Sequence, residues 1–180
     1  TIQGNLSMGN GTNTTTITAA TNATILTVNG NVSISPSATY AANAANPLKV
    51  SGNWTNSGTF THNNSTVSFI GTSAQIVDNG QKNFANIISS NTSSGGLTFS
   101  SNFTASQLFV KTSDLNSSAT IYFAGNSTFT ISTFSVNGAP SYPVVLRSTD
   151  SNASWYLNNT SSHFVSYVEV EDSNAAASKA

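Results

Sequence analysis

Short runs of β-branched and aromatic residues recur along the whole chain, each bounded by glycine, asparagine, serine or proline. Runs of this length and composition are typical of β-strands. We predict strands at residues 25–28, 32–34, 67–69, 97–99, 108–110, 121–123, 129–136, 144–146 and 164–170. Helical signals are confined to residues 41–45 and 174–177, which could form a turn or two at most. The pattern predicts an all-β protein, with a polar segment at residues 1–24 and a single β domain over residues 25–180.

Turn-forming dipeptides separate the predicted strands. They are Asn29-Gly30, Ser57-Gly58, Asn79-Gly80, Gly95-Gly96 and Asn137-Gly138. Glycine and asparagine tolerate the positive backbone angles that tight turns need. The dipeptides therefore favour short strands joined by tight corners.

One four-residue motif recurs at a nearly constant interval. Gly-Asn-apolar-Ser/Thr begins at Gly4, Gly30 and Gly52, and weaker copies contain Asn102, Asn126 and Asn152. The mean interval is about 24 residues if Asp78-Asn79 marks a copy that lacks the motif, and periods of this length indicate stacked repeats. We therefore predict a β-solenoid, similar to a parallel β-helix, with rungs of about 24 residues. The alternative is a β-sandwich or jelly roll with a donated N-terminal strand.

Asparagine begins the triplet Asn-x-Ser/Thr more often than composition explains. Fifteen of the 24 asparagines do so with x other than proline, whereas chance would give about seven or eight. The triplet is the acceptor for N-linked glycans on secreted or surface-exposed chains. We predict glycans at Asn5, Asn10, Asn13, Asn22, Asn31, Asn53, Asn64, Asn91, Asn102, Asn116, Asn126, Asn152 and Asn159, with at most one on each adjacent pair, Asn63/Asn64 and Asn158/Asn159.

Strand alternation indicates which face some of these asparagines occupy. In a strand, residues i and i+2 share one face, so the asparagine and its hydroxyl partner lie opposite the middle residue. The middle residues after Asn5, Asn31, Asn53 and Asn102 are Leu6, Val32, Trp54 and Phe103. If these apolar residues face the core, the four asparagines face solvent; the alternative is a hydrogen-bonded ladder of inward asparagines at the turns. Glycans on successive rungs would be only about 5 Å apart, which makes full occupancy of one column doubtful.

Two segments resemble units of large microbial cell-surface proteins of the parallel β-helix type. The first is Gly52-Asn53-Trp54-Thr55-Asn56-Ser57-Gly58-Thr59-Phe60, continued by residues 65–72 and 74–76, and the second comprises residues 145–148, 155–157 and 165–175. Together they cover about half of the chain. The resemblance implies a surface or adhesin-like role and no common enzymatic activity. Thread-like filaments of archaea are a comparison by analogy alone.

Charge is scarce along the chain. Five cationic and six acidic side chains give a net charge of −1, and 6% of residues are charged, against roughly 25% in typical soluble domains. The cations are scattered, which disfavours nucleic-acid binding, since a phosphate backbone needs clustered cations. No apolar run is long enough for a membrane span, and no signal peptide is visible, so we interpret the chain as a mature product. Many sequons without any cysteine favour a microbial cell surface, archaeal more than bacterial.

Residues that support catalysis or metal binding form no strong motif. Asp150 and Asp172 could stack on adjoining rungs as a carboxylate pair, although turn and surface roles are more common for such residues. His62 and His163 are isolated and lack metal-ligand spacing. Trp54, Trp155 and Tyr156 could form a sugar-stacking platform or pack in the core. We expect no catalytic residues, no metal and no cofactor.

The sequence thus predicts a heavily N-glycosylated extracellular structural protein, a subunit of a surface filament or coat. Its expected partners are copies of itself, joined through strand edges, and covalent N-linked glycans. Residues 1–24 could act as a strand donated to the next subunit. The alternative is an adhesin or carbohydrate-binding module of a larger surface protein. A polysaccharide lyase or hydrolase is a third hypothesis, weakened by the scarcity of acids.

Overall fold

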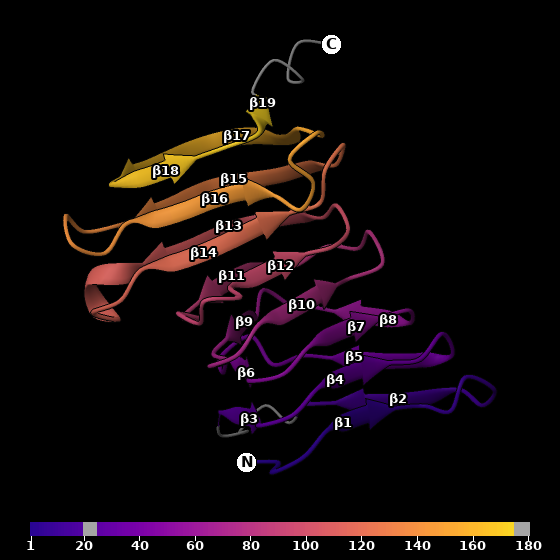
Figure 1. Cartoon of the computed structure of the whole chain (residues 1–180). Coiled ribbons are helices and arrows are strands. Elements are labelled where there is room, and N and C mark those ends of the chain that lie inside the picture. Colours follow the sequence, from indigo (N-terminus) through magenta and orange to yellow (C-terminus); the bar gives the residue numbers. More distant parts are fainter. Residues whose placement is uncertain (20–24, 175–180) are drawn as a thin grey trace.

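The computed structural model describes residues 1–19 and 25–174 of the 180-residue chain. The chain winds as a parallel β-solenoid of about seven turns with rungs of about 23 residues, which confirms the predicted fold class. Its coils stack into a rod, with the N-terminal coil at one end and the C-terminal coil at the other (Figure 1). Each strand lies parallel to the equivalent strand of the next coil.

Three sheets form the sides of the rod. Sheet B contains β1 (Leu6–Met8), β4 (Val32–Ile34), β7 (Trp54–Asn56), β10 (Gln75–Asp78), β12 (Leu97–Phe99), β14 (Ala119–Phe123), β16 (Val144–Ser148) and β18 (Val168–Val170). Sheet A contains β3 (Leu26–Val28), β6 (Leu48–Val50), β9 (Thr66–Phe69), β11 (Asn86–Ser89), β13 (Thr104–Lys111), β15 (Thr128–Asn137), β17 (Trp155–Ser166) and β19 (Ser173–Asn174). Sheet C contains only β2 (Thr15–Thr18), β5 (Ala38–Ala41) and β8 (Thr59–Thr61). A 3-10 turn, η1 (Thr112–Asp114), follows β13. The first three coils are therefore three-sided and the later coils two-sided.

The core fills the inside of the coils because strand residues alternate between the inside and the solvent. Register aligns equivalent inward residues, as in the pairs Leu6↔Val32 and Val32↔Trp54. Val32 and Trp54 are fully buried, whereas Thr55, the next residue along the chain, is exposed. Burial of one side chain per coil in each column supplies the hydrophobic driving force for stacking.

Aromatic rings continue the core along the rod axis. Phe123 stacks on Phe99 with ring centroids 5.7 Å apart, and on Trp155 with centroids 4.3 Å apart. Nearer the N-terminus, Tyr40 stacks on Phe60 at 5.9 Å. Such pairs contribute roughly 0.5–1.5 kcal/mol beyond the area they bury. They tie each coil to the next through side chains as well as through backbone hydrogen bonds.

The structure corrects two predicted elements. The run predicted as one strand at residues 164–170 is divided between β17 and β18, because Tyr167 adopts a positive φ of 47° and turns the corner between sheets. Residues 41–45 form no helix, since β5 ends at Ala41 and a loop follows. The other short helical signal, at residues 174–177, falls mostly outside the described residues.

Candidate functional site

Three asparagines, each immediately before a strand of sheet B, form a hydrogen-bonded ladder on the outside of the first coils. Oδ1 of Asn5 accepts a hydrogen bond from the backbone N–H of Asn31 at 2.8 Å. Oδ1 of Asn31 accepts one from the N–H of Asn53 at 2.8 Å. The ladder ends where Oδ1 of Asn53 accepts one from the N–H of Ile76, again at 2.8 Å. We call Asn5, Asn31 and Asn53 the asparagine ladder.

The glycines before Asn31 and Asn53 have a steric cause. A Cβ on Gly30 would lie 2.4 Å from Oδ1 of Asn5, and a Cβ on Gly52 would lie 2.4 Å from Oδ1 of Asn31. Both glycines also stand against the backbone of the preceding coil, since a Cβ on Gly52 would lie 2.6 Å from the carbonyl carbon of Gly30. The side chains of Asn5 and Asn31 therefore explain Gly30 and Gly52 on the coils that follow them. The coil after Asn53 has Gln75 at this position, and Gly4 has no atom within 4 Å of its Cβ position.

Two expectations were open for these positions, solvent-facing asparagines and a hydrogen-bonded ladder of inward asparagines, and the structure has a part of each. The middle residues Val32 and Trp54 are buried and Leu6 is half-buried, so the asparagines do lie on the outer face. They also form the ladder that was the alternative, but on the solvent side of the sheet. Within the described part of the chain, no group accepts a hydrogen bond from Nδ2 of any ladder asparagine. Nδ2 is the atom that would carry a glycan.

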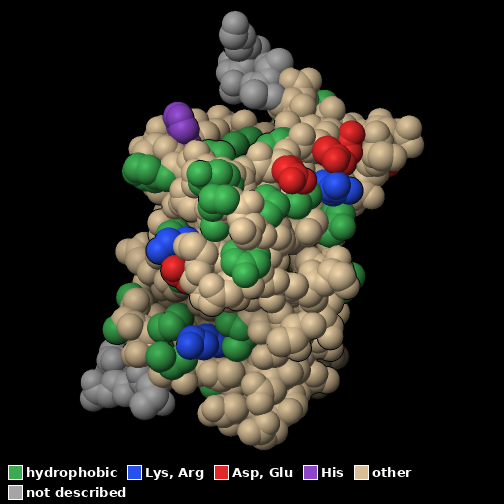
Figure 2. Space-filling model, turned by 60° about the vertical axis from the view of Figure 1, so that its left-hand side comes forward, with side chains coloured by type: hydrophobic (Ala, Val, Ile, Leu, Met, Phe, Trp, Pro, Cys, Tyr) green, Lys and Arg blue, Asp and Glu red, His purple; other side chains and the backbone are tan. Residues whose placement is uncertain are grey.

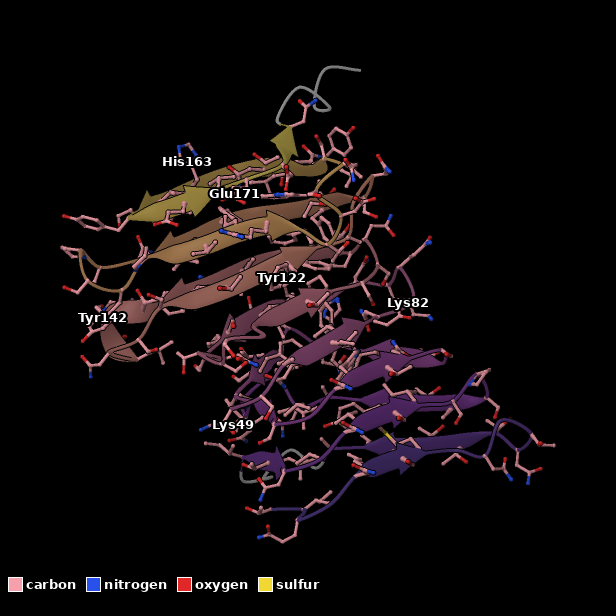
Figure 3. All side chains as sticks on the ribbon, viewed as in Figure 1. Lys49, Lys82, Tyr122, Tyr142, His163 and Glu171 are labelled. Carbon is pink, nitrogen blue, oxygen red and sulfur yellow. The ribbon has the colours of Figure 1, made fainter. Side chains whose placement is uncertain are left out.

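The column of the ladder continues through every later coil of sheet B with different residues. Register pairs Ile76 with Thr98, Thr98 with Tyr122, and Tyr122 with Arg147. One coil further lies Glu171, whose carboxylate accepts a hydrogen bond from Arg147 at 3.1 Å. Figure 3 labels Tyr122 and Glu171 in this column.

The later copies of the sequence motif do not lie in this column. Asn102, Asn126 and Asn152 follow the strands of sheet B and lie at corners between strands. In these coils the motif comes after the sheet B strand (β12, β14 or β16), whereas in the first coils it begins just before the strand. The interval of the motif thus predicted the coil length correctly but the place within the coil only up to Asn53.

Most of the remaining predicted glycan sites are exposed. Asn10, Asn13, Asn64, Asn116, Asn126 and Asn152 are exposed, and Asn102 is half-buried. Three of them, Asn64, Asn116 and Asn126, adopt positive φ values of 59°, 51° and 58° at corners, a conformation in which asparagine is enriched. Asn22 lies outside the described residues.

Two of the predicted sites are unsuited to modification in the folded chain. Asn91 is fully buried, and its Nδ2 donates to the carbonyl of Ser73 at 2.8 Å and to Oε1 of Gln75 at 3.0 Å. Nδ2 of Asn159 donates to the carbonyls of Ile131, Ser132 and Ser162 at 2.9, 2.9 and 3.1 Å. A sugar on either nitrogen would displace these bonds, so we leave both positions out of the proposed set.

The adjacent sequons also differ in their hydrogen bonds. Nδ2 of Asn63 donates to the carbonyl of Ala42 at 3.0 Å. Asn64 is exposed, and its carbonyl oxygen accepts from Asn86. Asn64 is therefore the member of this pair that is better placed for a glycan.

The C-terminal end of the rod exposes side chains that face the core in earlier coils. Val165 pairs with Val136 and Val170 pairs with Leu146, and both partners are buried. Val165 and Val170 are nevertheless 51% and 49% exposed, because no described coil covers them. His163, which pairs with the buried Phe134, points into the same groove.

This groove has a volume of about 440 Å³. Its lining includes Trp155, Leu157, His163, Val165, Val168 and Val170. Phe164 and Tyr167 beside it are each 59% exposed. Nothing in the sequence signals this exposure, since Val165 and Val170 look like core residues and are exposed because no described coil covers them.

Free strand edges lie mainly at the two ends of the described rod. Among the described residues, β1 and β18 in sheet B and β19 in sheet A have a partner on one side only, whereas the outer edge of β3 is bridged by Ile2. Sheet C has a further free edge at β8. Unpaired edges of this kind are templates for another strand.

Other candidate chemistry is dispersed in the structure. Trp54 and Trp155 are buried and hydrogen-bonded through Nε1, so neither forms an exposed sugar platform. Oδ1 of Asp150 accepts from the N–H of Asn152 at 2.9 Å and holds a turn. Among the described residues no three His, Asp or Glu side chains group as metal ligands. On the side of the molecule that Figure 2 shows, few side chains are charged.

The fold places the protein in the class of parallel β-solenoids. The chain matches no known protein family, no curated protein and no solved structure. Over residues 1–19 and 25–174, no helix has the length and apolar character needed to cross a membrane.

Proposed function

We propose that this protein is an extracellular structural subunit that stacks end to end with copies of itself into a surface filament or coat. The observation that carries the proposal is the last described coil, where core-type side chains are half-exposed beside sheet edges that have no partner among the described residues. An exposed apolar groove next to an unpaired edge favours pairing with another chain.

A second copy has the right kind of surface to cover this end. All strands of a solenoid run in parallel, so the edge at one end has the hydrogen-bonding direction that the edge at the other end requires. Stacking would place β1 of one copy beside β18 of the next and continue sheet B across the junction. Ile2 and Leu6 are half-buried side chains of the first coil that pack against the core of the same copy. They lie at the surface that would meet the groove of the next copy.

Stacking of complete coils is a simpler route than donation of residues 1–24. β1 pairs with β4, and β2 pairs with β5, within the same chain. Donation of this segment would first break both pairings. We therefore propose edge-to-edge stacking as the mode of assembly.

N-linked glycans are the second part of the proposal. Only 11 side chains carry charge, and surface charge is the usual source of solubility. The exposed sequons on corners and on the outer face of sheet B could supply hydration in its place. Because they lie on the sides of the rod, glycans there would leave the ends free to stack.

Substitution at the open end tests the assembly. Val165→Lys and Val170→Lys each put a charge into the groove, and no described coil above them needs to repack. The matched control is Ser106→Lys, on the exposed side of β13. Electron microscopy and sedimentation should show filaments or oligomers for the unaltered chain and for Ser106→Lys, and monomers for the two valine variants. Equal assembly of all four proteins would refute stacking through this end.

A further inference from the structure

Asn53 occupies the last position of the asparagine ladder and has a different neighbour from the other two. Its Oδ1 accepts a hydrogen bond from the N–H of Ile76 at 2.8 Å. The Oδ1 atoms of Asn5 and Asn31 accept instead from the N–H of the next asparagine in the ladder. Ile76 is 50% exposed, and its side chain points outward from β10. An isolated isoleucine thus stands in solvent one coil after an asparagine whose Nδ2 has no acceptor among the described residues.

We infer that Asn53 carries an N-linked glycan whose first sugar covers Ile76, and that Asn31 on the same molecule stays unmodified. The inference rests on the glycoprotein part of the proposed function and assigns one site within it. It uses a side chain that the ladder already holds in place, so modification costs little conformational entropy at Asn53.

The chemistry requires an activated sugar donor, supplied as a lipid-linked sugar 1-phosphate or diphosphate. Nδ2 of Asn53 forms a bond to the anomeric carbon, and the bond from that carbon to the phosphate oxygen breaks. The lipid phosphate leaves with the electron pair, and one of the two amide protons passes to a base of the transferase. Oδ1 is unchanged, so the hydrogen bond from Ile76 survives the reaction.

Amide geometry directs the sugar toward Ile76. A secondary amide is planar and trans, which places the sugar carbon on the same side of the C–N bond as Oδ1. Oδ1 points to the N–H of Ile76, so the sugar tilts toward the coil that contains Ile76. The next coil is only about 4.8 Å away, within reach of the apolar C–H face of a sugar ring. Contact between the two removes apolar surface from water.

The same geometry argues against a glycan on Asn31. A sugar there would tilt toward Asn53, which is one coil away at about 4.8 Å. It would occupy the space that the glycan of Asn53 needs and would find a polar side chain in place of isoleucine. Asn53 is therefore the favoured member of the pair.

Variants at the hydroxyl position separate the glycan from the ladder. Thr55 is exposed on β7 and completes the sequon of Asn53, while the ladder bond uses only Asn53 and Ile76. Thr55→Ala removes the sequon and keeps the ladder, whereas Thr55→Ser keeps both. Glycopeptide mass spectrometry of protein from cells that perform N-glycosylation should show the glycan on Asn53 in the unaltered chain and in Thr55→Ser, and its loss in Thr55→Ala.

A thermal double-mutant cycle tests the contact with Ile76. In the chain with Ile76, Thr55→Ala should lower the unfolding midpoint by a few degrees. In the Ile76→Thr background, the same substitution should lower the midpoint by much less. An equal shift in both backgrounds would overturn the contact.

The occupancy map separates this inference from the proposed function. Glycans at other sequons with a bare Asn53, or glycans on Asn31 and Asn53 of one molecule, overturn the inference alone. A bare polypeptide mass overturns it together with the glycoprotein part of the proposed function. Filament formation is measured separately and is unaffected by either result.

Discussion

Oδ1 of Asn31 accepts a hydrogen bond from the backbone N–H of Asn53 at 2.8 Å, and this bond joins two coils from the outside of the rod. An asparagine side chain thus takes the acceptor role that a backbone carbonyl has in the strand ladder. The asparagine that the sequence motif predicts as a glycan acceptor is therefore also a structural residue, because its side chain bonds to the next coil.

Removing the acceptor should weaken the second and third coils. Asn31→Ala leaves the N–H of Asn53 without its partner, and we expect a loss of about 0.5–1 kcal/mol in the free energy of unfolding, because the bond is solvent-accessible. Urea denaturation of unglycosylated protein measures it. Asn31→Asp keeps an acceptor oxygen and should retain most of the stability, and Ser33→Ala on the same strand is the control. A loss in Ser33→Ala as large as in Asn31→Ala would refute the role of the ladder.

The glycines of the motif should differ in their tolerance of a methyl group. A Cβ on Gly52 would lie 2.4 Å from Oδ1 of Asn31 and 2.6 Å from the carbonyl carbon of Gly30, whereas a Cβ on Gly4 has no atom within 4 Å. Gly52→Ala should therefore cost about 1–3 kcal/mol or more through overpacking, while Gly4→Ala is close to neutral. The two glycines occupy the same motif position, so thermal denaturation of the pair isolates the effect of the preceding coil. Equal behaviour would contradict the steric explanation.

Trp155 should behave as a core residue and not as a sugar ligand. It is 2% exposed and stacks on Phe123 with centroids 4.3 Å apart. Trp155→Ala should lower the free energy of unfolding by about 3–5 kcal/mol, and Trp155→Phe by less, since it retains the stacking partner. Chemical denaturation gives both values. Unchanged stability combined with lost glycan binding would instead support the adhesin hypothesis.

Tyr40 should make the fold sensitive to alkali. Burial raises the pKa of Tyr40 above its ordinary value of 10.0. Because the folded pKa is the higher one, the unfolded chain loses the phenol proton first, and stability is lost as pH rises through the range above 10. Tyr40→Phe should retain the stacking on Phe60 and reduce the alkaline loss of stability. Identical pH profiles for both proteins, measured by circular dichroism, would contradict this contribution.

The sequence predicted those parts of the fold that depend on strand alternation. Runs such as residues 32–34 and 97–99 match β4 and β12 in full, because their apolar residues alternate with small polar ones. Strands with only one or two apolar residues between polar ones were missed, such as β8 (Thr59–Thr61) around Phe60 and β11 (Asn86–Ser89) around Ile87 and Ile88. Those strands form because the neighbouring coils provide backbone partners, which no local pattern records.

The site was predictable to a similar extent. The outer position of Asn31 and Asn53 followed from the apolar residues between Asn and Ser/Thr. The burial of Asn91 did not, because its partners Ser73 and Gln75 belong to the preceding coil and become neighbours only when the coils stack. The open end was not predictable for the same reason.

An engineered disulfide between copies tests end-to-end stacking most directly. Glu171 lies in the column of the asparagine ladder, so continuation of sheet B across the junction would place it beside Asn5 of the next copy, with Cα atoms about 4.8 Å apart and within disulfide range. The chain has no cysteine, and the two positions are at opposite ends of one rod. A chain with Asn5→Cys and Glu171→Cys should form a reducible ladder of dimers, trimers and longer polymers on oxidation. A chain with Asn5→Cys and Thr98→Cys, whose second cysteine lies midway along the rod, should not. Monomers alone from the first chain, or the same ladder from both, would contradict assembly through the solenoid ends.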